Sequence, residues 1–176
     1  MRKLLNEELN RLTVEEFKEA QKIPLIIVLD NVRSMNNIGS VFRTSDAFLV
    51  KKIYLCGITA SPPHKDIHKT ALGATESVEW EYFENSLDAL KILKDEGVFT
   101  LAVEQAEKSI DLEKFEPEPG KSIAVVFGHE VRGVHQDVVN FCEAALEINQ
   151  YGTKHSLNIS VCAGIVIWEL AKKMKG

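Results

Sequence analysis

Short apolar runs recur along the chain, and most of them lack a polar alternate face. A strand with one wet face alternates apolar and polar residues, whereas a strand buried on both faces reads as a continuous apolar run. We therefore predict the strands of a parallel sheet that is covered on both sides. These strands are Leu25–Leu29, Ile53–Cys56, Val78–Tyr82, Phe99–Val103, Ile123–Phe127 and Ala145–Ile148.

Helical patterns lie between these runs, at Ile38–Phe48, Leu87–Lys94 and Val134–Phe141. The alternation predicts a doubly wound α/β domain, with a mostly parallel sheet and helices on both faces. Ahead of the first strand, Thr13 and Glu16 have the spacing of a capping box for a short helix. A chain of 176 residues with 45% apolar content suits one domain, so we expect a helical extension over residues 1–22 and one α/β domain over residues 23–176.

The last helical stretch differs from the others. From Leu157 through Trp168 it has no charged residue, whereas a surface helix keeps a polar face. Such a helix needs cover on more than one side. The core of a single domain supplies that cover in one interpretation, and a second subunit supplies it in the other.

The formal net charge of -5 argues against a protein that coats nucleic acid by charge alone. A local basic face remains compatible with this value. Eight cations fall near the candidate site segments described below: Arg33, Arg43, Lys51, Lys52, Lys65, Lys69, Arg132 and Lys154.

The three cysteines, Cys56, Cys142 and Cys162, stand far apart in apolar runs. No C-x-x-C pair is present, so we predict buried free thiols. No stretch approaches the roughly 20 apolar residues of a membrane span, and the N-terminus lacks the apolar core of a signal peptide. We expect a cytoplasmic protein without a membrane partner.

Three polar segments follow predicted strands, where open α/β sheets bind their ligands. They run from Asp30 to Arg43, from Phe127 to Val134 and from Asn149 to Asn158. Gly128 and Gly133 permit tight turns and a close approach of ligand to main chain. Several polar residues have a structural alternative as helix N-caps, namely Asn37, Ser40, Ser156 and Asn158.

Arg43 is harder to explain as a structural residue. It lies inside a predicted helix whose neighbours Val41, Phe42, Ala47 and Phe48 are expected to be buried. A guanidinium near a core needs an anionic or hydrogen-bonding partner, which makes Arg43 a candidate functional residue.

Together the three segments resemble the motifs of the SpoU/TrmH family of RNA methyltransferases. The first motif's Asn-x-Gly and downstream arginine are Asn37, Gly39 and Arg43. The second motif's Phe-Gly-x-Glu-x-x-Gly is Phe127–Gly133, and the glycine and Ser-Leu-Asn-Ile-Ser of the third motif are Gly152 and Ser156–Ser160. The resemblance covers Pro24–Leu170, and three ordered motifs are far more specific than one. One departure is Asn149, where the family commonly has proline.

The resemblance implies a SPOUT-type enzyme that uses S-adenosylmethionine to methylate a ribose 2′-hydroxyl of RNA. It implies a tRNA substrate, with ribosomal RNA as the alternative, and no metal. It also implies a deep C-terminal trefoil knot and a homodimer held by the last helix. The implied cofactor contacts are Phe127, Gly128, Glu130, Gly133, Ile148, Gln150, Gly152, Ser156 and Leu157.

The same resemblance places Arg43, Asn37, Glu130, Ser156 and Asn158 in the catalytic centre. Arg43 is no ordinary base, because a guanidinium in a protein does not readily give up its proton. We expect it to bind the target's phosphate or the developing alkoxide, while the other four orient the hydroxyl and one another. A transiently neutral Arg43 is the alternative.

Rival functions have weaker support in the sequence. No G-x-G-x-x-G follows the first strand, and no P-loop motif occurs. His64 and His68 have the spacing of metal ligands, but Lys65 and Lys69 beside them favour a solvated basic patch. An RNA-binding protein that has lost catalysis is the alternative from another class, and its affinity for S-adenosylmethionine would separate the two.

Overall fold

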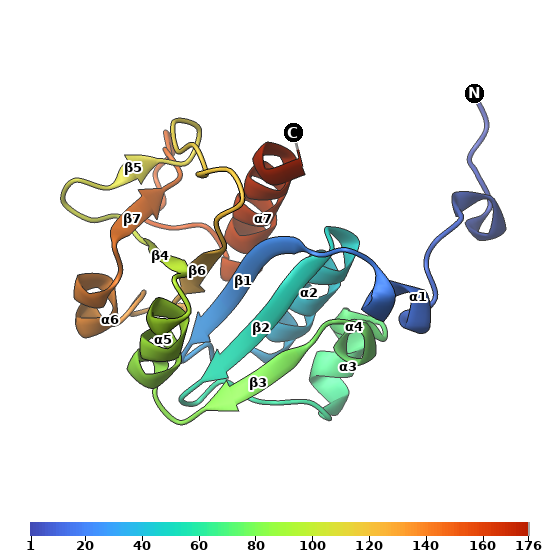
Figure 1. Cartoon of the computed structure of the whole chain (residues 1–176), viewed down its shortest axis with the longest axis horizontal. Coiled ribbons are helices and arrows are strands. Elements are labelled where there is room, and N and C mark those ends of the chain that lie inside the picture. Colours follow the sequence, from blue (N-terminus) through green and yellow to red (C-terminus); the bar gives the residue numbers. More distant parts are fainter. Residues whose placement is uncertain (176) are drawn as a thin grey trace.

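The computed structural model describes residues 1–175, in which seven strands form one sheet of order β3-β2-β1-β6-β4-β7-β5 (Figure 1). Each pair of neighbouring strands is parallel. The strands are β1 (Ile23–Asp30), β2 (Val50–Cys56), β3 (Trp80–Phe83), β4 (Phe99–Val103), β5 (Ile110–Asp111), β6 (Ile123–Phe127) and β7 (Ala144–Glu147). The helices are α1 (Val14–Glu19), α2 (Met35–Ala47), α3 (Lys65–Ala71), α4 (Ala74–Ser77), α5 (Ser86–Asp95), α6 (Gln136–Phe141) and α7 (Ile159–Lys175), with a 3-10 turn at Asn6–Leu9.

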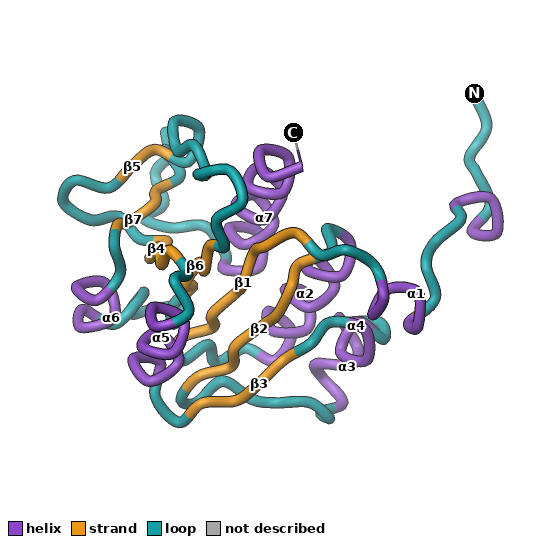
Figure 2. The backbone as a smooth tube through the Cα atoms, viewed as in Figure 1, coloured by secondary structure: helices purple, strands orange, loops and turns teal. Residues whose placement is uncertain are grey.

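Helices cover both faces of the sheet, as Figure 2 shows. Side chains alternate across a strand, so β1 feeds two cores. Its Leu25, Ile27 and Leu29 pack with α2, α3 and α7, whereas Ile26 and Val28 pack with α5 and α6. The predicted α/β class and parallel sheet are therefore confirmed.

Most element boundaries follow the sequence pattern, and the differences have local causes. The strands β4 and β6 match their predicted bounds. The strand β3 starts at Trp80 rather than at Val78, because Val78 ends α4 as its buried C-cap. The helix α6 starts two residues later than predicted, since the His135 side chain caps it.

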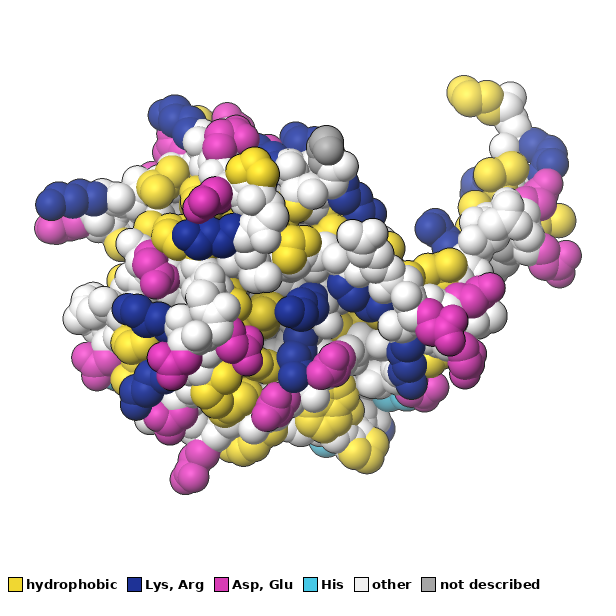
Figure 3. Space-filling model, in the orientation of Figure 1, with side chains coloured by type: hydrophobic (Ala, Val, Ile, Leu, Met, Phe, Trp, Pro, Cys, Tyr) yellow, Lys and Arg dark blue, Asp and Glu magenta, His cyan; other side chains and the backbone are white. Residues whose placement is uncertain are grey.

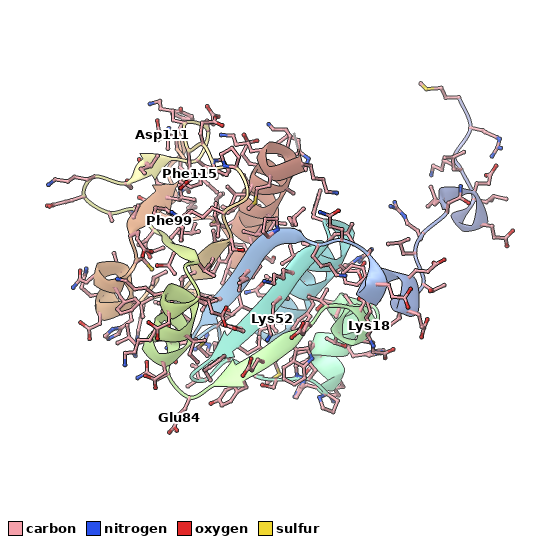
Figure 4. The ribbon with its side chains drawn as sticks, viewed as in Figure 1. Lys18, Lys52, Glu84, Phe99, Asp111 and Phe115 are labelled. Carbon is pink, nitrogen blue, oxygen red and sulfur yellow. The ribbon has the colours of Figure 1, made fainter. Side chains whose placement is uncertain are left out.

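The segment after β4 leaves the sheet and returns to it. Its strand β5 pairs with β7, and the ring of Phe115 lies 6.4 Å from that of Phe99 at the start of β4 (Figure 4). Near the C-terminal end of the chain, the Lys173 ammonium donates to the carbonyls of Leu112, Glu113 and Phe115. The segment between β4 and β6 thus contacts both β7 and α7.

The N-terminal residues stand apart from the body (Figure 1). The predicted capping box is present: the Thr13 hydroxyl accepts from the Glu16 N–H and the Glu16 carboxylate accepts from the Thr13 N–H. Phe17 anchors α1 in the core, whereas the four leucines ahead of it are exposed: Leu4, Leu5, Leu9 and Leu12.

The helix α7 buries one face and exposes another. Ala163, Val166 and Ile167 are fully buried, while Val161 is 52% and Trp168 52% exposed. The interpretation that a single domain covers the whole circumference is therefore wrong. Within residues 1–175, no helix is both long enough and apolar enough to cross a membrane.

Candidate active site

A chain of hydrogen bonds joins the three polar segments beyond the carboxyl ends of β1 and β6. Asn37 is its centre: its amide nitrogen donates to Glu130 at 3.1 Å, and its oxygen accepts from the Asn158 amide at 3.4 Å. Asn158 in turn accepts from the Ser160 N–H and hydroxyl at 2.9 and 2.6 Å. The sequence-predicted residues Asn37, Glu130 and Asn158 thus orient one another.

Glu130 is held as a carboxylate by three donors from the first segment. Besides Asn37, the N–H groups of Arg33 and Ser34 donate to it at 3.1 and 2.8 Å. Partial burial by itself would raise the pKa of the Glu130 carboxyl, but backbone N–H groups and the Asn37 amide outweigh burial and lower the pKa. Glu130 is therefore ionised at neutral pH and serves as an acceptor.

Of the residues in the three polar segments that the sequence offered as helix N-caps, only Asn158 caps a helix. Ser34, and neither Asn37 nor Ser40, caps α2, because its hydroxyl accepts from the Asn37 N–H. Ser40 instead donates to the carbonyl of Asn36. Asn158 does cap α7 through the Ser160 N–H, so it has both a structural contact and a site contact. Because the Asn37 side chain does not cap α2, its amide can donate to Glu130.

A cavity of about 1100 Å³ opens beside this cluster, at the ends of β4, β6 and β7. Of the nine predicted cofactor contacts, eight line it: Phe127, Gly128, Glu130, Gly133, Ile148, Gln150, Ser156 and Leu157. Gly152 does not line it; it is exposed, and a Cβ there would meet nothing within 4 Å. Asn158 also lines the cavity.

Gly128 lets the second segment close tightly. A Cβ at Gly128 would lie 2.2 Å from the carbonyl carbon of Gly133 and 2.2 Å from the nitrogen of Val134. The N–H of His129 donates to the Gly133 carbonyl, and the Gly133 N–H to that of His129. Main chain therefore borders the cavity where a ligand must approach closely.

Arg43 lies outside the cluster. It is exposed and, within residues 1–175, makes no hydrogen bond or ion pair. The expectation of a nearly buried guanidinium is wrong, because Ala47 is exposed and Phe48 only half-buried. Arg43 stands six residues beyond Asn37, about 9 Å along the helix axis and on a different face. Ser156 also makes no hydrogen bond within residues 1–175, although it lines the cavity.

Two site residues outside the three motifs were not predicted. Glu104, after β4, accepts from the Val134 N–H at 3.0 Å, and the Gln105 amide donates to the His155 carbonyl at 2.7 Å. Both line the cavity, and they tie the second and third segments to the same strand. Their only signal in the sequence was polar character directly after a buried strand.

Asp30, the first residue of the first segment, lies at the carboxyl end of β1. It is 2% exposed and accepts from the Ser86 hydroxyl at 2.5 Å and from the His135 N–H at 3.1 Å. Both donors stand at helix N-termini, which stabilise a buried carboxylate that lacks a cation. Asp30 thereby fixes the far end of the second segment.

Comparison with known proteins shows to which family this chain belongs. The profile of the SpoU rRNA methylase family matches residues 24–168. The chain belongs to the SpoU rRNA methylase family. It is 26% identical over 166 residues to the 23S rRNA (guanosine-2′-O-)-methyltransferase RlmB of Vibrio parahaemolyticus, covering 94% of this chain and 66% of that one.

Two solved structures are similar to this SpoU-family chain. The A. aeolicus TrmH/SpoU tRNA modifying enzyme has a TM-score of 0.79 at 25% identity, over 91% of this chain and 81% of its own. The AdoMet-bound rRNA methyltransferase of Sinorhizobium meliloti has a TM-score of 0.80 at 25% identity, over 89% and 59%. The chain spans 63% of the length of the TrmH-family relative from Staphylococcus saprophyticus that it matches.

Asn149 stands where the SpoU family commonly has proline. The Lys114 ammonium and the Asn149 amide both lower the pKa of the Asp111 carboxyl in β5. The Asn149 amide thus favours the charged form of a carboxyl in a neighbouring strand, and asparagine lacks the fixed φ of proline.

The cysteines are free, but only Cys56 is fully buried. Burial raises the pKa of the Cys56 and Cys142 thiols to about 12, and burial together with the charge of Glu104 raises that of Cys162 to about 11. All three are protonated at neutral pH, so none is an activated nucleophile. Among residues 1–175, no group of three or more histidine, cysteine or acidic side chains is placed to hold a metal.

Proposed function

We propose that this SpoU-family protein transfers a methyl group from S-adenosylmethionine to a ribose 2′-hydroxyl of RNA. The observation that carries the proposal is the hydrogen-bonded cluster of Asn37, Glu130 and Asn158 beside the cavity. It unites one residue from each of the three motifs. The name of the RlmB relative, a guanosine-2′-O-methyltransferase, supports the ribose as the acceptor.

The cavity residues suit S-adenosylmethionine, which supplies a methyl group on a sulfonium. Apolar walls from Val103, Leu146 and Ile148 fit an adenine ring, and the tight main-chain turn at Gly128 presents backbone polar groups. The carboxylates of Glu104 and Glu130 at the same cavity favour a cationic ligand.

The chain's own residues then have distinct roles. Glu130 and Asn158 have their acceptor oxygens engaged by backbone and side-chain donors, so they fix the loops rather than take a proton. Ser156 lines the cavity and makes no contact with residues 1–175 that would compete with the substrate hydroxyl. Arg43, exposed and always charged, binds an RNA phosphate or the developing alkoxide.

A dimer through α7 completes this site. Val161, Ile165 and Trp168 recur at helical spacing and are 52%, 38% and 52% exposed. The same helix lines the cavity through Ile159 and Cys162, and it packs against α2. A second copy on α7 therefore brings its own α2, with Arg43, toward the cavity. Mixing Arg43→Ala protomers with Glu130→Ala protomers tests this: restored activity in the mixed dimers supports supply across the interface, and no restoration contradicts it.

We also propose the family's C-terminal trefoil knot. The support is that the excursion over residues 104–122 contacts both ends of the C-terminal segment, through Gln105 to His155 and through Lys173 to Phe115. Stretching single molecules from their two ends tests it. A knotted chain stops short of its full contour length, whereas an unknotted chain reaches it.

The RNA is tRNA in our proposal, as for the A. aeolicus neighbour, with ribosomal RNA favoured by the RlmB relative as the second candidate. Mapping ribose methylation in total RNA with and without the gene decides between them. A methylation site that is lost from tRNA without the gene supports tRNA as the substrate. A site that is lost from ribosomal RNA supports ribosomal RNA. Calorimetric titration with S-adenosylmethionine separates the enzyme from an RNA binder that has lost the cofactor: saturable binding supports the enzyme, and the absence of binding contradicts it.

A further inference from the structure

A second cavity, of about 620 Å³, lies between the loop ahead of α3, α3, α4 and the start of β3. Trp80, Pro62, Pro63 and Ile67 give it flat apolar walls. Its other lining residues are His64, Lys65, His68, Thr75 and Glu76. It shares no residue with the cavity beside Glu130.

One wall of this cavity is the helix α3, whose other side touches the site helix α2. The two helices cross at Gly39, where a Cβ would lie 2.1 Å from the Thr70 hydroxyl and 2.3 Å from the Ile67 carbonyl oxygen. The Thr70 hydroxyl donates to the carbonyl of Asn36 at 3.0 Å. Gly39 and Arg43 are one turn apart on the same face of α2. Arg43 therefore lies on the side of α2 against which α3 packs.

Cations outnumber acidic residues in the chain segment that contains α2 and α3, although the chain is acidic overall and Glu76 lines the cavity. Residues 31–75 contain six lysines and arginines and two acidic residues, against a net charge of -5 for the chain. Four of the six, Arg33, Arg43, Lys65 and Lys69, are exposed and make no ion pair within residues 1–175. On the face that Figure 3 shows, by contrast, cations and anions are interspersed. Exposed cations without an acidic partner attract an anionic polymer.

We propose that the second cavity binds an unpaired nucleobase of the RNA, next to the nucleotide that is methylated, while Lys65 and Lys69 contact the adjoining phosphates. The proposal rests on the proposed function of the protein. A cavity lined by an indole and two prolines suits base stacking, which tolerates any base, and the Thr75 hydroxyl and Glu76 carboxylate are available to its polar edge. The cavity holds the RNA strand beside Arg43.

Fluorescence of Trp80 tests the proposal directly. The chain has two tryptophans, so Trp168→Phe leaves Trp80 as the single reporter. Oligoadenylate of about eight nucleotides should quench it, whereas an abasic ribose-phosphate oligomer of the same length should bind through its phosphates without quenching. In a Trp80→Phe protein, the remaining Trp168 should not respond. A silent Trp80 at saturating oligoadenylate overturns the proposal.

Kinetics of the full protein supply a second test. Trp80→Leu should raise the KM for RNA about 5- to 100-fold, the range expected for loss of one base stack, and leave the Kd for S-adenosylmethionine unchanged. The matched control is Tyr82→Leu, on the same strand, 48% exposed and outside the cavity. An unchanged KM for RNA in Trp80→Leu overturns the proposed base-binding role of the second cavity and leaves the proposed methyltransferase function standing. If the wild-type protein methylates no RNA while Trp80 still responds to oligoadenylate, the proposed function fails and the pocket stands.

Discussion

Asn37 and Arg43 belong to one motif and one helix but stand in different environments. Asn37 is held between Glu130 and Asn158, whereas Arg43 is exposed and free of contacts within residues 1–175. A side chain without structural contacts can be removed without destabilising the fold. Arg43 is therefore the site residue whose effect on catalysis can be separated most cleanly from its effect on stability.

We predict that Arg43→Ala folds, dimerises and binds S-adenosylmethionine nearly normally while methyl transfer falls by about 10²–10³, as on loss of one preorganised electrostatic contact. Arg43→Lys should restore activity only in part, because a point charge cannot span two oxygens as a guanidinium does. Melting temperature, cofactor affinity and single-turnover methylation of one preparation provide the check. The control is Lys51→Ala. Lys51 is an exposed cation at the amino-terminal end of β2, away from the carboxyl ends of the strands, and the variant should keep normal turnover. Near-normal turnover in Arg43→Ala would refute the assignment.

Glu130 predicts a pH dependence of stability. Its pKa is lowered from 4.5 in the folded protein, so its stabilisation is fully present above about pH 4.5 and is lost as the pH falls through the lowered value. Glu130→Gln cannot accept from all three donors and should cost about 1–3 kcal/mol at pH 7. Urea unfolding from pH 7 to pH 3 should show the two proteins converging below pH 4.5. A constant gap would mean that the charge of Glu130 is not what stabilises the loops.

The sequence predicted the residues of the site better than their contacts. Phe127 ends a run of apolar residues that had to be a buried strand, and Gly128 and Glu130 follow it, so the apolar pattern alone placed them at the carboxyl end of that strand. The partners of Asn37 were not predictable in the same way, because Glu130 is 93 residues distant in the chain. The N-cap of α2 was not predictable either. Four polar residues stand near the start of this helix, Ser34, Asn36, Asn37 and Ser40, and the sequence pattern does not indicate which of them caps it.

At the scale of elements, the loop after β4 does more than connect strands. Through Glu104 it holds the second motif, and through Gln105 the third. Such contacts keep two ligand-binding loops at fixed positions relative to the sheet. The affinity of the cavity then depends on residues outside all three motifs.

We predict that Gln105→Ala weakens binding of S-adenosylmethionine about 3- to 10-fold without lowering the melting temperature of the ligand-free protein. The physical reason is that the lost bond, from the Gln105 amide to the His155 carbonyl, restrains an exposed loop and no part of the core. Calorimetry measures the affinity, and hydrogen exchange should quicken over residues 153–158 only. Gln136→Ala, which also lines the cavity but bonds to Asn140 within α6, is the control. Equal affinities in wild type and Gln105→Ala would contradict the prediction.

Elements with a buried apolar run or a capping pattern were predictable, whereas three short ones, β5, α3 and α4, were not. The strand β6 is buried at every position and matched its predicted bounds. The strand β5 has two residues and exists because Ile110 pairs with Leu146, a tertiary contact that no local pattern records. The helices α3 and α4, of seven and four residues, are too short for a period of 3.6 to show.

At the scale of the whole molecule, α7 connects the core, the cavity and an uncovered apolar surface. Its buried face packs on β1 and α2, and its first turns line the cavity. Its third face is the exposed row of Val161, Ile165 and Trp168. The unbroken apolar sequence from Leu157 to Trp168 predicted the need for further cover, but not which side would lack it.

We predict that Ile165→Lys converts a dimer to a monomer, because a lysine in the middle of this row would be buried without a partner. Light scattering at micromolar concentration should give the dimer mass for wild type and the monomer mass for the variant. The matched control is Ile92→Lys on α5, an isoleucine 43% exposed on the opposite layer, which should stay dimeric. A soluble and active wild-type monomer would contradict the prediction.

Identification of the methylated product tests the central claim most directly. Purified protein is incubated with S-adenosylmethionine carrying a labelled methyl group and with RNA from cells that lack the gene, and the RNA is digested to nucleosides for mass spectrometry. The account predicts label in a 2′-O-methylated nucleoside with wild type and about 10²–10³ less with Arg43→Ala. Label on a base, or none in RNA despite saturable cofactor binding, would contradict it.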